Sequence, residues 1–350
     1  MRLSSKERVL AAFAHETPDR VPAWCGASEA FWAKAKAELG KDDEGLRLFF
    51  GDDFRRVFAA YAGPEFPLRH PKATCRTLFG VEREGLGYGQ PISHPLAKAT
   101  LDEIHAYPWP DPRWMDVSGV RDAASAWQGE YAILGGDWSP FWHDAIDLFG
   151  MEGLMMRMCE APDEVDAVMT HLVDFYFESS RQLFDVAADV IDIFFFGNDL
   201  GSQHGPIVSE ALYRRFLFPH LKRLAGLAKE YHLKVMMHCC GGVAELIPLF
   251  IEAGIDALHA VQPSCRGMDL HTLKRTYGDN MVFNGAIDSH HILINGTPDA
   301  VRSATRDVLD IMKPGGGFIA GASHDTILEE TPVENIVAMF ETIRDYGVYP

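Results

Sequence analysis

The feature that most constrains the fold is a regular alternation of short apolar runs with amphipathic helical stretches, from Tyr131 onward. Each run is rich in β-branched or aromatic residues and ends in glycine or polar residues, as buried strands of a parallel sheet do. The six runs are YAILGGDW, DVIDIFFFGNDLG, LKVMMHCCGG, DALHAVQ, NMVFNGAID and GGFIAGASHD. Such repeated β–α units predict helices packed around a parallel sheet.

The order of these runs, in a chain of 350 residues, predicts an α/β fold with a single (β/α)8 TIM barrel spanning residues 1–350. The N-terminal third is expected to pack onto the barrel as an extension. It should supply two more strands, one of them around RVPAW at 20–24. Helices are expected at 209–231 and 298–312, the second with Thr297 as its N-cap.

The charge and the apolar patterning exclude several classes of protein. Thirty-two Lys and Arg against fifty Asp and Glu give a net charge of −18, which would repel a phosphate backbone, so no nucleic-acid partner is expected. The apolar run at 191–196 is far shorter than the roughly 18 residues of a membrane helix. The N-terminus carries charges where a signal peptide would be apolar, so we expect a cytoplasmic protein.

The ends of the predicted strands carry most of the chemically capable side chains. In a parallel barrel these ends converge on one face, where active sites of this architecture lie. The competing interpretation is that polar residues follow strands only because loops are polar. The residues are Asp137 and Trp138; Asn198 and Asp199; His238, Cys239 and Cys240; His259 and Gln262; Asn284 and Asp288; and Ser323, His324 and Asp325.

The segment MMHCCGG at 236–242 is the sharpest local signal. On a strand, His238 and Cys240 point to one face while Cys239 points to the other. Imidazole and thiolate together suit zinc better than magnesium or calcium. The alternative is a buried histidine beside two small buried thiols. We expect His324 as the third metal ligand, with Asp325 as a fourth ligand or as an acceptor for an imidazole N–H.

Five segments, read in order, resemble the uroporphyrinogen decarboxylase superfamily. They run nearly from end to end of the chain, and the resemblance implies a single (β/α)8 barrel with its site in the barrel mouth. The segments are SSKERVLAAFAHETPDRVPAW, GNDLGSQHGPIVSEALYRRFLFPHLKRL, HCCGG, GAIDSHHILINGTPDAV and GGGFIAGASHDTILEETPVENIVAMFETI.

Within the superfamily, the sequence is closer to the zinc-dependent, corrinoid-linked methyltransferases than to the true decarboxylases. True decarboxylases carry an arginine-rich segment of the RQAGRY type, whereas this chain has PAWCGASEAFW at 22–32, without arginine. The methyltransferase branch carries H-x-C, which His238 and Cys240 match. The chain departs from that branch at 323–325, where SHD replaces GCG and His324 stands in for a cysteine.

The resemblance implies a zinc-dependent methyltransferase acting between a small thiol or O-methyl substrate and a corrinoid (cobalamin). Because no D-x-H-x-x-G segment is found, the corrinoid is expected to come from a partner protein. A zinc ion would keep a thiol deprotonated or act as a Lewis acid on an ether oxygen. The alternatives are a porphyrinogen decarboxylase that works without metal and a non-catalytic zinc-binding or corrinoid-docking module.

The remaining candidates surround this centre. Asp199 corresponds to the second acid of the family's G-D-D-L-G segment and, with His324, is expected to be catalytic, although a turn role for Asp199 is the alternative. Aromatic residues could wall a flat substrate, but such clusters also form cores. The substrate-binding candidates are Trp138, Trp142, Asn198, Asp288 and Gln262.

Overall fold

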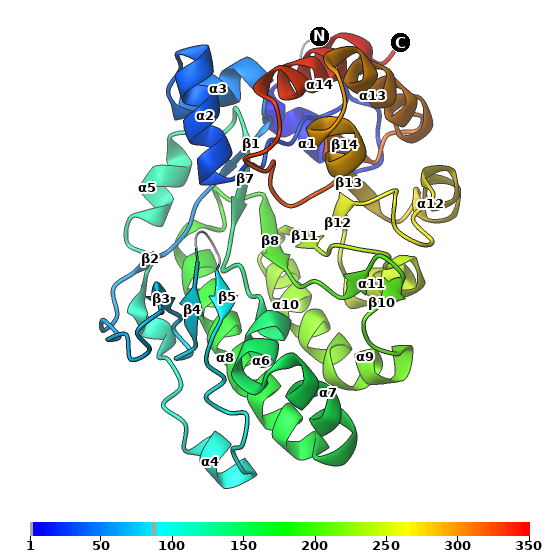
Figure 1. Cartoon of the computed structure of the whole chain (residues 1–350). Coiled ribbons are helices and arrows are strands. Elements are labelled where there is room, and N and C mark those ends of the chain that lie inside the picture. Colours follow the sequence, from blue (N-terminus) through cyan, green and yellow to red (C-terminus); the bar gives the residue numbers. More distant parts are fainter. Residues whose placement is uncertain (1–2, 86–88) are drawn as a thin grey trace.

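The computed structural model describes residues 3–85 and 89–350. Its centre is a curled, seven-stranded parallel sheet in the order β1-β7-β8-β11-β12-β13-β14 (Figure 1). Each of the six apolar runs predicted as a strand contains one of these strands. The strands are β1 (Phe54–Arg56), β7 (Ala132–Gly135), β8 (Ile193–Gly197), β11 (Lys234–His238), β12 (Ala257–Val261), β13 (Val282–Ile287) and β14 (Phe318–Ala322).

Helices connect the successive strands and cover the outside of the sheet (Figure 1). In chain order, the connecting and closing helices are α4 (Leu101–His105), α5 (Val120–Ser125), α6 (Phe141–Phe149), α7 (Met151–Glu160), α8 (Pro162–Ala187), α9 (Glu210–Phe216), α10 (Phe218–Glu230), α11 (Ile247–Ala253), α12 (Leu270–Tyr277), α13 (Pro298–Met312) and α14 (Val333–Tyr346). Two 3₁₀ turns (Pro112–Trp114 and Ala244–Leu246) and a π-helix (Ser289–Ile294) complete them.

Smaller elements precede or branch from this framework. The helices before β1 are α1 (Ser5–Phe13), α2 (Glu29–Leu39) and α3 (Asp43–Phe50). Three short antiparallel sheets pair β2 (Ala60–Tyr61) with β6 (Met115–Asp116), β4 (Glu82–Glu84) with β3 (Cys75–Arg76) and β5 (Gln90–Pro91), and β9 (Gly201–Ser202) with β10 (Gly205–Pro206). Among the described residues, no helix has both the length and the apolar character of a membrane span.

The segment predicted as a strand at 20–24 lies between the two edges of the sheet. The amide of Trp24 donates to the carbonyl of Ala320 in β14 at 2.9 Å, and the amide of Ala320 donates to Pro22 at 2.8 Å. On the other side, the amide of Asp53, which precedes β1, donates to Ala23 at 3.0 Å. The segment therefore connects β14 to β1 by backbone hydrogen bonds, although it is too short to count as a strand of the sheet.

Alternation of side chains along the strands separates two cores. Phe195 packs inside the curled sheet with Trp24 and with Phe13 of α1, whereas Phe194 and Phe196 point outward to the covering helices. Because both faces of the sheet are buried, the strands read as continuous apolar runs. This explains why the sequence pattern revealed them.

The two predicted helices had different outcomes. The helix predicted at 298–312 is confirmed as α13, with the Thr297 hydroxyl accepting from the amide of Ala300 at 3.3 Å. The single helix predicted at 209–231 is wrong, because the chain breaks into α9 and α10 at Leu217. Pro219, which follows the break, has no N–H to continue the hydrogen-bond ladder of α9.

Helix α6 carries a buried acid, Asp144. Asp144 is 9% exposed, and the Tyr176 hydroxyl of α8 donates to its carboxylate. Burial raises the pKa of Asp144 to about 7, against the opposing effect of the Tyr176 hydrogen bond. The unfolded chain would ionise this group near its ordinary pKa of about 4.

We therefore predict that Asp144→Asn removes part of the pH dependence of stability. Between about pH 4 and pH 7 native Asp144 keeps a proton that the unfolded chain has lost, so the free energy of unfolding falls by about 1.4 kcal/mol per pH unit. The amide cannot ionise, so the variant should gain stability relative to the unsubstituted protein as the pH rises through this window. Urea unfolding at pH 5 and pH 7.5 measures this; a difference that does not change with pH would refute it.

Candidate metal centre

Strands β8 and β11 bring the site together. Their parallel register places Gly197, the last residue of β8, beside His238, the last residue of β11. The amide of Asn198 then donates to the carbonyl of His238 at 2.9 Å, which extends the pairing by one step. Asp199 and Cys240 each lie two residues after these paired strand ends, so they emerge from the sheet side by side.

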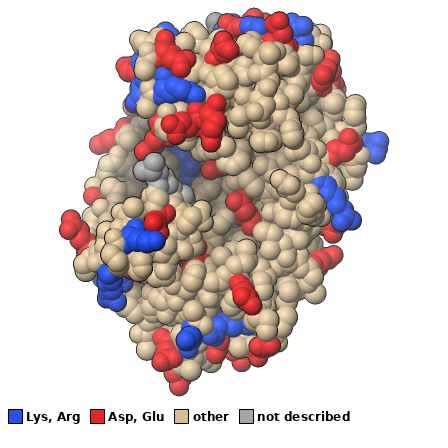
Figure 2. Space-filling model, viewed as in Figure 1, with Lys and Arg blue, Asp and Glu red and all other residues tan. Residues whose placement is uncertain are grey.

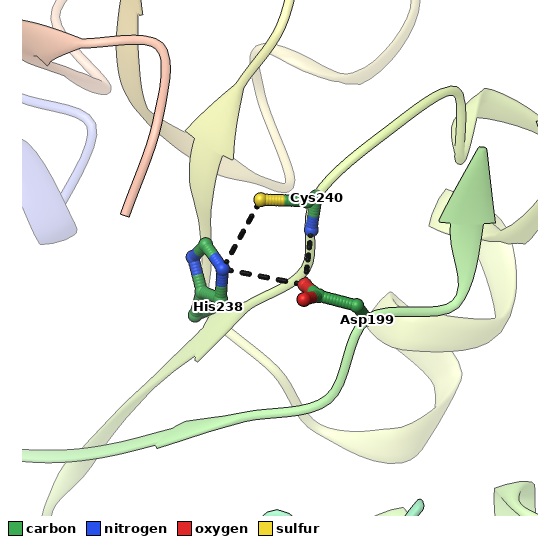
Figure 3. Close-up of side chains that lie close together, drawn as sticks. All are labelled: Asp199, His238 and Cys240. Carbon is green, nitrogen blue, oxygen red and sulfur yellow. Dashed lines mark hydrogen bonds and ion pairs between the residues drawn. The ribbon is translucent and has the colours of Figure 1, made fainter. Parts of the chain in front are cut away.

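The side chains of Asp199, His238 and Cys240 point toward one another (Figure 3). His238 Nε2 lies 3.2 Å from Cys240 Sγ and 3.3 Å from Asp199 Oδ1. The backbone amide of Cys240 donates to the same Asp199 oxygen at 2.8 Å. All three ligand atoms lie within 4.8 Å of one another, a spacing that one metal ion could bridge.

The donor set fits a borderline-soft metal. One imidazole nitrogen, one sulfur and one carboxylate oxygen are ligands that zinc accepts in a tetrahedral site, and three of them leave a fourth position open. His238 is buried, whereas Asp199 and Cys240 are half-buried, so the centre faces solvent on their side. Cys239 turns away as the strand geometry predicts: it is buried, and its sulfur accepts from the amide of Leu200 at 3.3 Å.

Neighbouring groups shift the pKa values of Asp199 and His238. Burial alone would raise the pKa of the Asp199 carboxyl, but hydrogen bonds from His143 (Nε2 to Oδ2, 3.2 Å) and His238 hold it well below its usual range. Burial alone would lower the pKa of His238, but the adjacent Cys240, Asp325 and Asp199 raise it well above its ordinary value. Without a metal, Asp199 is therefore an anion that favours a protonated His238, and a metal ion at Nε2 would take the place of that proton.

A second group of potential ligands meets the opposite edge of the same imidazole. Strand pairing places His259 of β12 beside His238, with the two Nδ1 atoms 3.0 Å apart. Asp325, from the loop after β14, lies 3.9 Å from His238 Nδ1 through its Oδ1. His259 is fully buried, and burial, together with the Coulombic effect of neighbouring His238, lowers its pKa well below the ordinary value.

His324, expected as the third ligand, belongs to neither group among the described residues. Its Nδ1 lies 3.0 Å from the carbonyl oxygen of Thr326 in its own loop. The loop after β14 instead directs Asp325 toward His238, and Asp199 provides the third donor near Cys240. The sequence pattern could not decide which of His324, Asp325 and Asp199 is the third ligand, because all three follow strands.

Two of the expected substrate-binding residues, Asn198 and Trp142, are fully buried. Asn198 is fully buried; its Oδ1 accepts from the amide of Trp142 at 2.9 Å and its Nδ2 donates to the carbonyl of Ser139 at 3.1 Å. Trp142 is itself fully buried in the outer core. The hydrogen bonds of Asn198 hold the start of α6 against the end of β8, and a substrate contact of either residue stays a prediction.

Gln262 and Asp288 are also engaged with backbone groups. Gln262 Oε1 accepts from the amide of Gly241 at 2.8 Å and so supports the loop that carries Cys240. Asp288 caps the π-helix by accepting from the amide of His291 at 2.6 Å. Both remain half-buried near the strand ends, and their contacts with a substrate stay a prediction.

A cavity of about 640 Å³ is lined by two residues that contact His238, although none of the three candidate ligands lines it. Trp138 lines it and stacks on His238 with ring centroids 5.9 Å apart, and Asp325, whose Oδ1 lies 3.9 Å from His238 Nδ1, also lines it. Aromatic side chains form much of the remaining wall, and the space-filling view shows a hollowed face on which acidic and basic side chains are interspersed (Figure 2). Of the expected substrate contacts, Trp138 is the one placed at this cavity.

The family model of uroporphyrinogen decarboxylase (URO-D) matches residues 84–346. The chain belongs to this family. The match covers every strand of the central sheet except β1, and it includes all three residues of the candidate metal centre.

Relatives in this family carry two kinds of names. A methylcobamide:CoM methyltransferase, MtbA, of Methanosarcina mazei is 25% identical over 97% of this chain and 98% of its own length. A uroporphyrinogen decarboxylase of Aromatoleum aromaticum is 26% identical over 79% of this chain and 75% of its own. A solved methyltransferase from Methanosarcina mazei, 18% identical, superposes with a TM-score of 0.71 over 99% of both chains, which shows a shared fold.

In the sequence analysis of this URO-D family member, two histidines that contact the candidate metal ligands were given no role. His143 lies on α6 and contacts Asp199, and His259 had been noted at a strand end without a role. The signal for His259 was its place on the strand after the H-x-C strand. For His143 the signal was its position near the start of α6, the helix that follows β7.

Proposed function

We propose that this member of the URO-D family is a zinc-dependent methyltransferase that moves a methyl group between a small thiol or O-methyl substrate and a corrinoid (cobalamin) carried by a partner protein. The donor set of Asp199, His238 and Cys240, within 4.8 Å, carries the proposal. The full-length similarity to relatives named methylcobamide:CoM methyltransferases, in Methanosarcina mazei and Methanosarcina acetivorans, supports it.

We assign His238, Cys240 and Asp199 as the ligands and keep Asp199 and His324 as the candidate catalytic residues. Bound zinc would hold a thiol substrate as thiolate, or polarise an ether oxygen. Asp199 has a second task, because it accepts the Cys240 amide and so orients the loop that carries the sulfur. Trp138 stacks on His238 and lines the cavity, so it connects the ligand to the space that a substrate would enter.

We further propose that residues 1–350 form one closed (β/α)8 domain. The hydrogen bonds of segment 22–24 to both β14 and the residue before β1 support closure. A cytoplasmic location is part of the proposal, because all six cysteines are free thiols, which suits a reducing compartment.

A porphyrinogen decarboxylase is the second candidate, favoured by one observation. Although segment 22–32 has no arginine, Arg47, Arg55 and Arg56 line the cavity from the next part of the chain. Guanidinium groups there could hold substrate carboxylates. Against this, Arg47 is paired with Asp52 at 2.7 Å and Arg55 is paired with Glu44, so much of their charge is already neutralised.

Anaerobic turnover assays separate the candidates. We expect the zinc-loaded protein to demethylate free methylcobalamin in the presence of small thiols, or to methylate reduced cobalamin from an O-methyl compound, and to leave uroporphyrinogen unchanged. Loss of the methylcobalamin spectrum, with matching formation of a methyl thioether, measures the first reaction. Decarboxylation of uroporphyrinogen by the metal-free protein would contradict the proposal, and zinc binding without any turnover would identify a docking module.

A further inference from the structure

The imidazole of His238 lies between two sets of potential ligands. Its Nε2 faces Cys240 and Asp199, and its Nδ1 faces His259 and Asp325. A neutral imidazole has a lone pair on one nitrogen and a proton on the other, so only one edge can bind a metal while the other donates a hydrogen bond. The position of the metal therefore determines what the opposite edge must do.

The distances indicate which edge of the His238 ring suits a metal ion and which suits a hydrogen bond. Two N or O ligands of a tetrahedral zinc, each about 2.0–2.1 Å from the ion, lie roughly 3.4 Å apart. His238 Nε2 and Asp199 Oδ1, at 3.3 Å, match this separation. His238 Nδ1 and His259 Nδ1, at 3.0 Å, have the length of a hydrogen bond, and Asp325 is farther away at 3.9 Å.

We propose that His259 is the positioning residue of the metal centre: its Nδ1 accepts a hydrogen bond from His238 Nδ1–H. This bond keeps His238 in the tautomer whose Nε2 lone pair faces Asp199 and Cys240. The inference rests on the proposed zinc site. His259 takes the role that a carboxylate or carbonyl plays behind many metal-binding histidines.

The surroundings of His259 suit a neutral acceptor. The residue is fully buried, and its ring packs against Trp24 and Phe195 with centroids 5.0 Å and 5.4 Å away. When Nδ1 accepts, the proton of His259 is on Nε2, which has no hydrogen-bond partner among the described residues and lies in this aromatic enclosure. The strand pairing of His238 with His259 fixes the facing edges of the two rings. A carboxylate at the same place would be a buried charge with a much larger desolvation cost.

The test compares metal binding by His259→Leu, which has no acceptor, with that by His259→Asn, whose side-chain carbonyl can accept. His271→Leu, on the exposed face of α12, is the matched control. Zinc affinity is measured by chelator competition, and cobalt substitution reports the thiolate-to-metal absorption band. We expect His259→Leu to weaken binding roughly 10–100-fold with the band retained, His259→Asn to restore most of the affinity, and His271→Leu to change nothing.

Nitrogen NMR of the zinc-loaded, unsubstituted protein tests the same point without a variant that could misfold. The inference predicts a protonated Nδ1 and a metal-bound Nε2 on His238. The reverse assignment would overturn it, as would unchanged affinity in His259→Leu, or metal loss in His259→Leu and Asp325→Asn with retention in Cys240→Ser. Failure of the unsubstituted protein to bind zinc would instead overturn the proposed function, on which this inference depends.

Discussion

Cys240→Ser is expected to lower the zinc affinity at least roughly 100-fold, whereas Cys239→Ser should leave it within about twofold. The two cysteines are adjacent and chemically identical, but only Cys240 faces His238, with its sulfur 3.2 Å from Nε2. Removing one of three protein ligands leaves a site that competes poorly with water and chelators. Competition with a chromophoric chelator measures the dissociation constants of both variants.

The Cys239 variant has its own expected effect, on stability. Its thiol is buried in the outer core and accepts the amide of Leu200, a bond that a serine hydroxyl can largely replace. A loss of about 1 kcal/mol in the free energy of unfolding is expected. If both variants lost zinc equally, the geometry of the strand end would be wrong.

The largest effect on stability is expected from Asp53→Ala, which should lower the free energy of unfolding by about 3–5 kcal/mol. Asp53 is fully buried and accepts from Arg8 at 2.7 Å, from Arg20 at 2.8 and 2.9 Å, and from the Ser5 hydroxyl and the Ala23 amide, each at 2.7 Å. Alanine would leave the buried Arg8 with Asp19 as its carboxylate partner, and it would remove the carboxylate that pairs with Arg20 and accepts the Ala23 amide of the segment between β14 and β1. Urea unfolding of the full chain measures the change.

A matched control is the exposed pair of Arg344 and Asp345, whose side chains are 58% and 69% accessible. Asp345→Ala should cost about 0–1 kcal/mol, because solvent already screens that pair. Equal losses from Asp53→Ala and Asp345→Ala would show that the buried network does not hold the N-terminal segment.

Much of the sheet could be predicted from the sequence, because strands buried on both faces leave continuous apolar runs that glycine and polar residues terminate. Phe194, Phe195 and Phe196 form such a run, although they divide between two cores. The break between α9 and α10 could not be predicted with the same ease, because the amphipathic pattern continues through Leu217. There the local constraint of Pro219 outweighed the periodic signal.

The part of the site that depends on spacing along one strand was predicted. The part that depends on pairing between strands was not. The period of a strand is enough to place His238 and Cys240 on one face. The approach of Asp199 and His259 depends on the register of β8, β11 and β12, which a single sequence does not reveal. His324 was favoured because its position matches a cysteine of related methyltransferases, but the turn with Thr326 determines which residue of that loop faces His238.

X-ray absorption at the zinc edge of the zinc-loaded protein tests the central claim most directly. The site of Asp199, His238 and Cys240 predicts one sulfur at about 2.3 Å and nitrogen or oxygen ligands at about 2.0–2.1 Å, with the sulfur absent from Cys240→Ser. A shell without sulfur in the unsubstituted protein, or one with two sulfurs, would contradict the account.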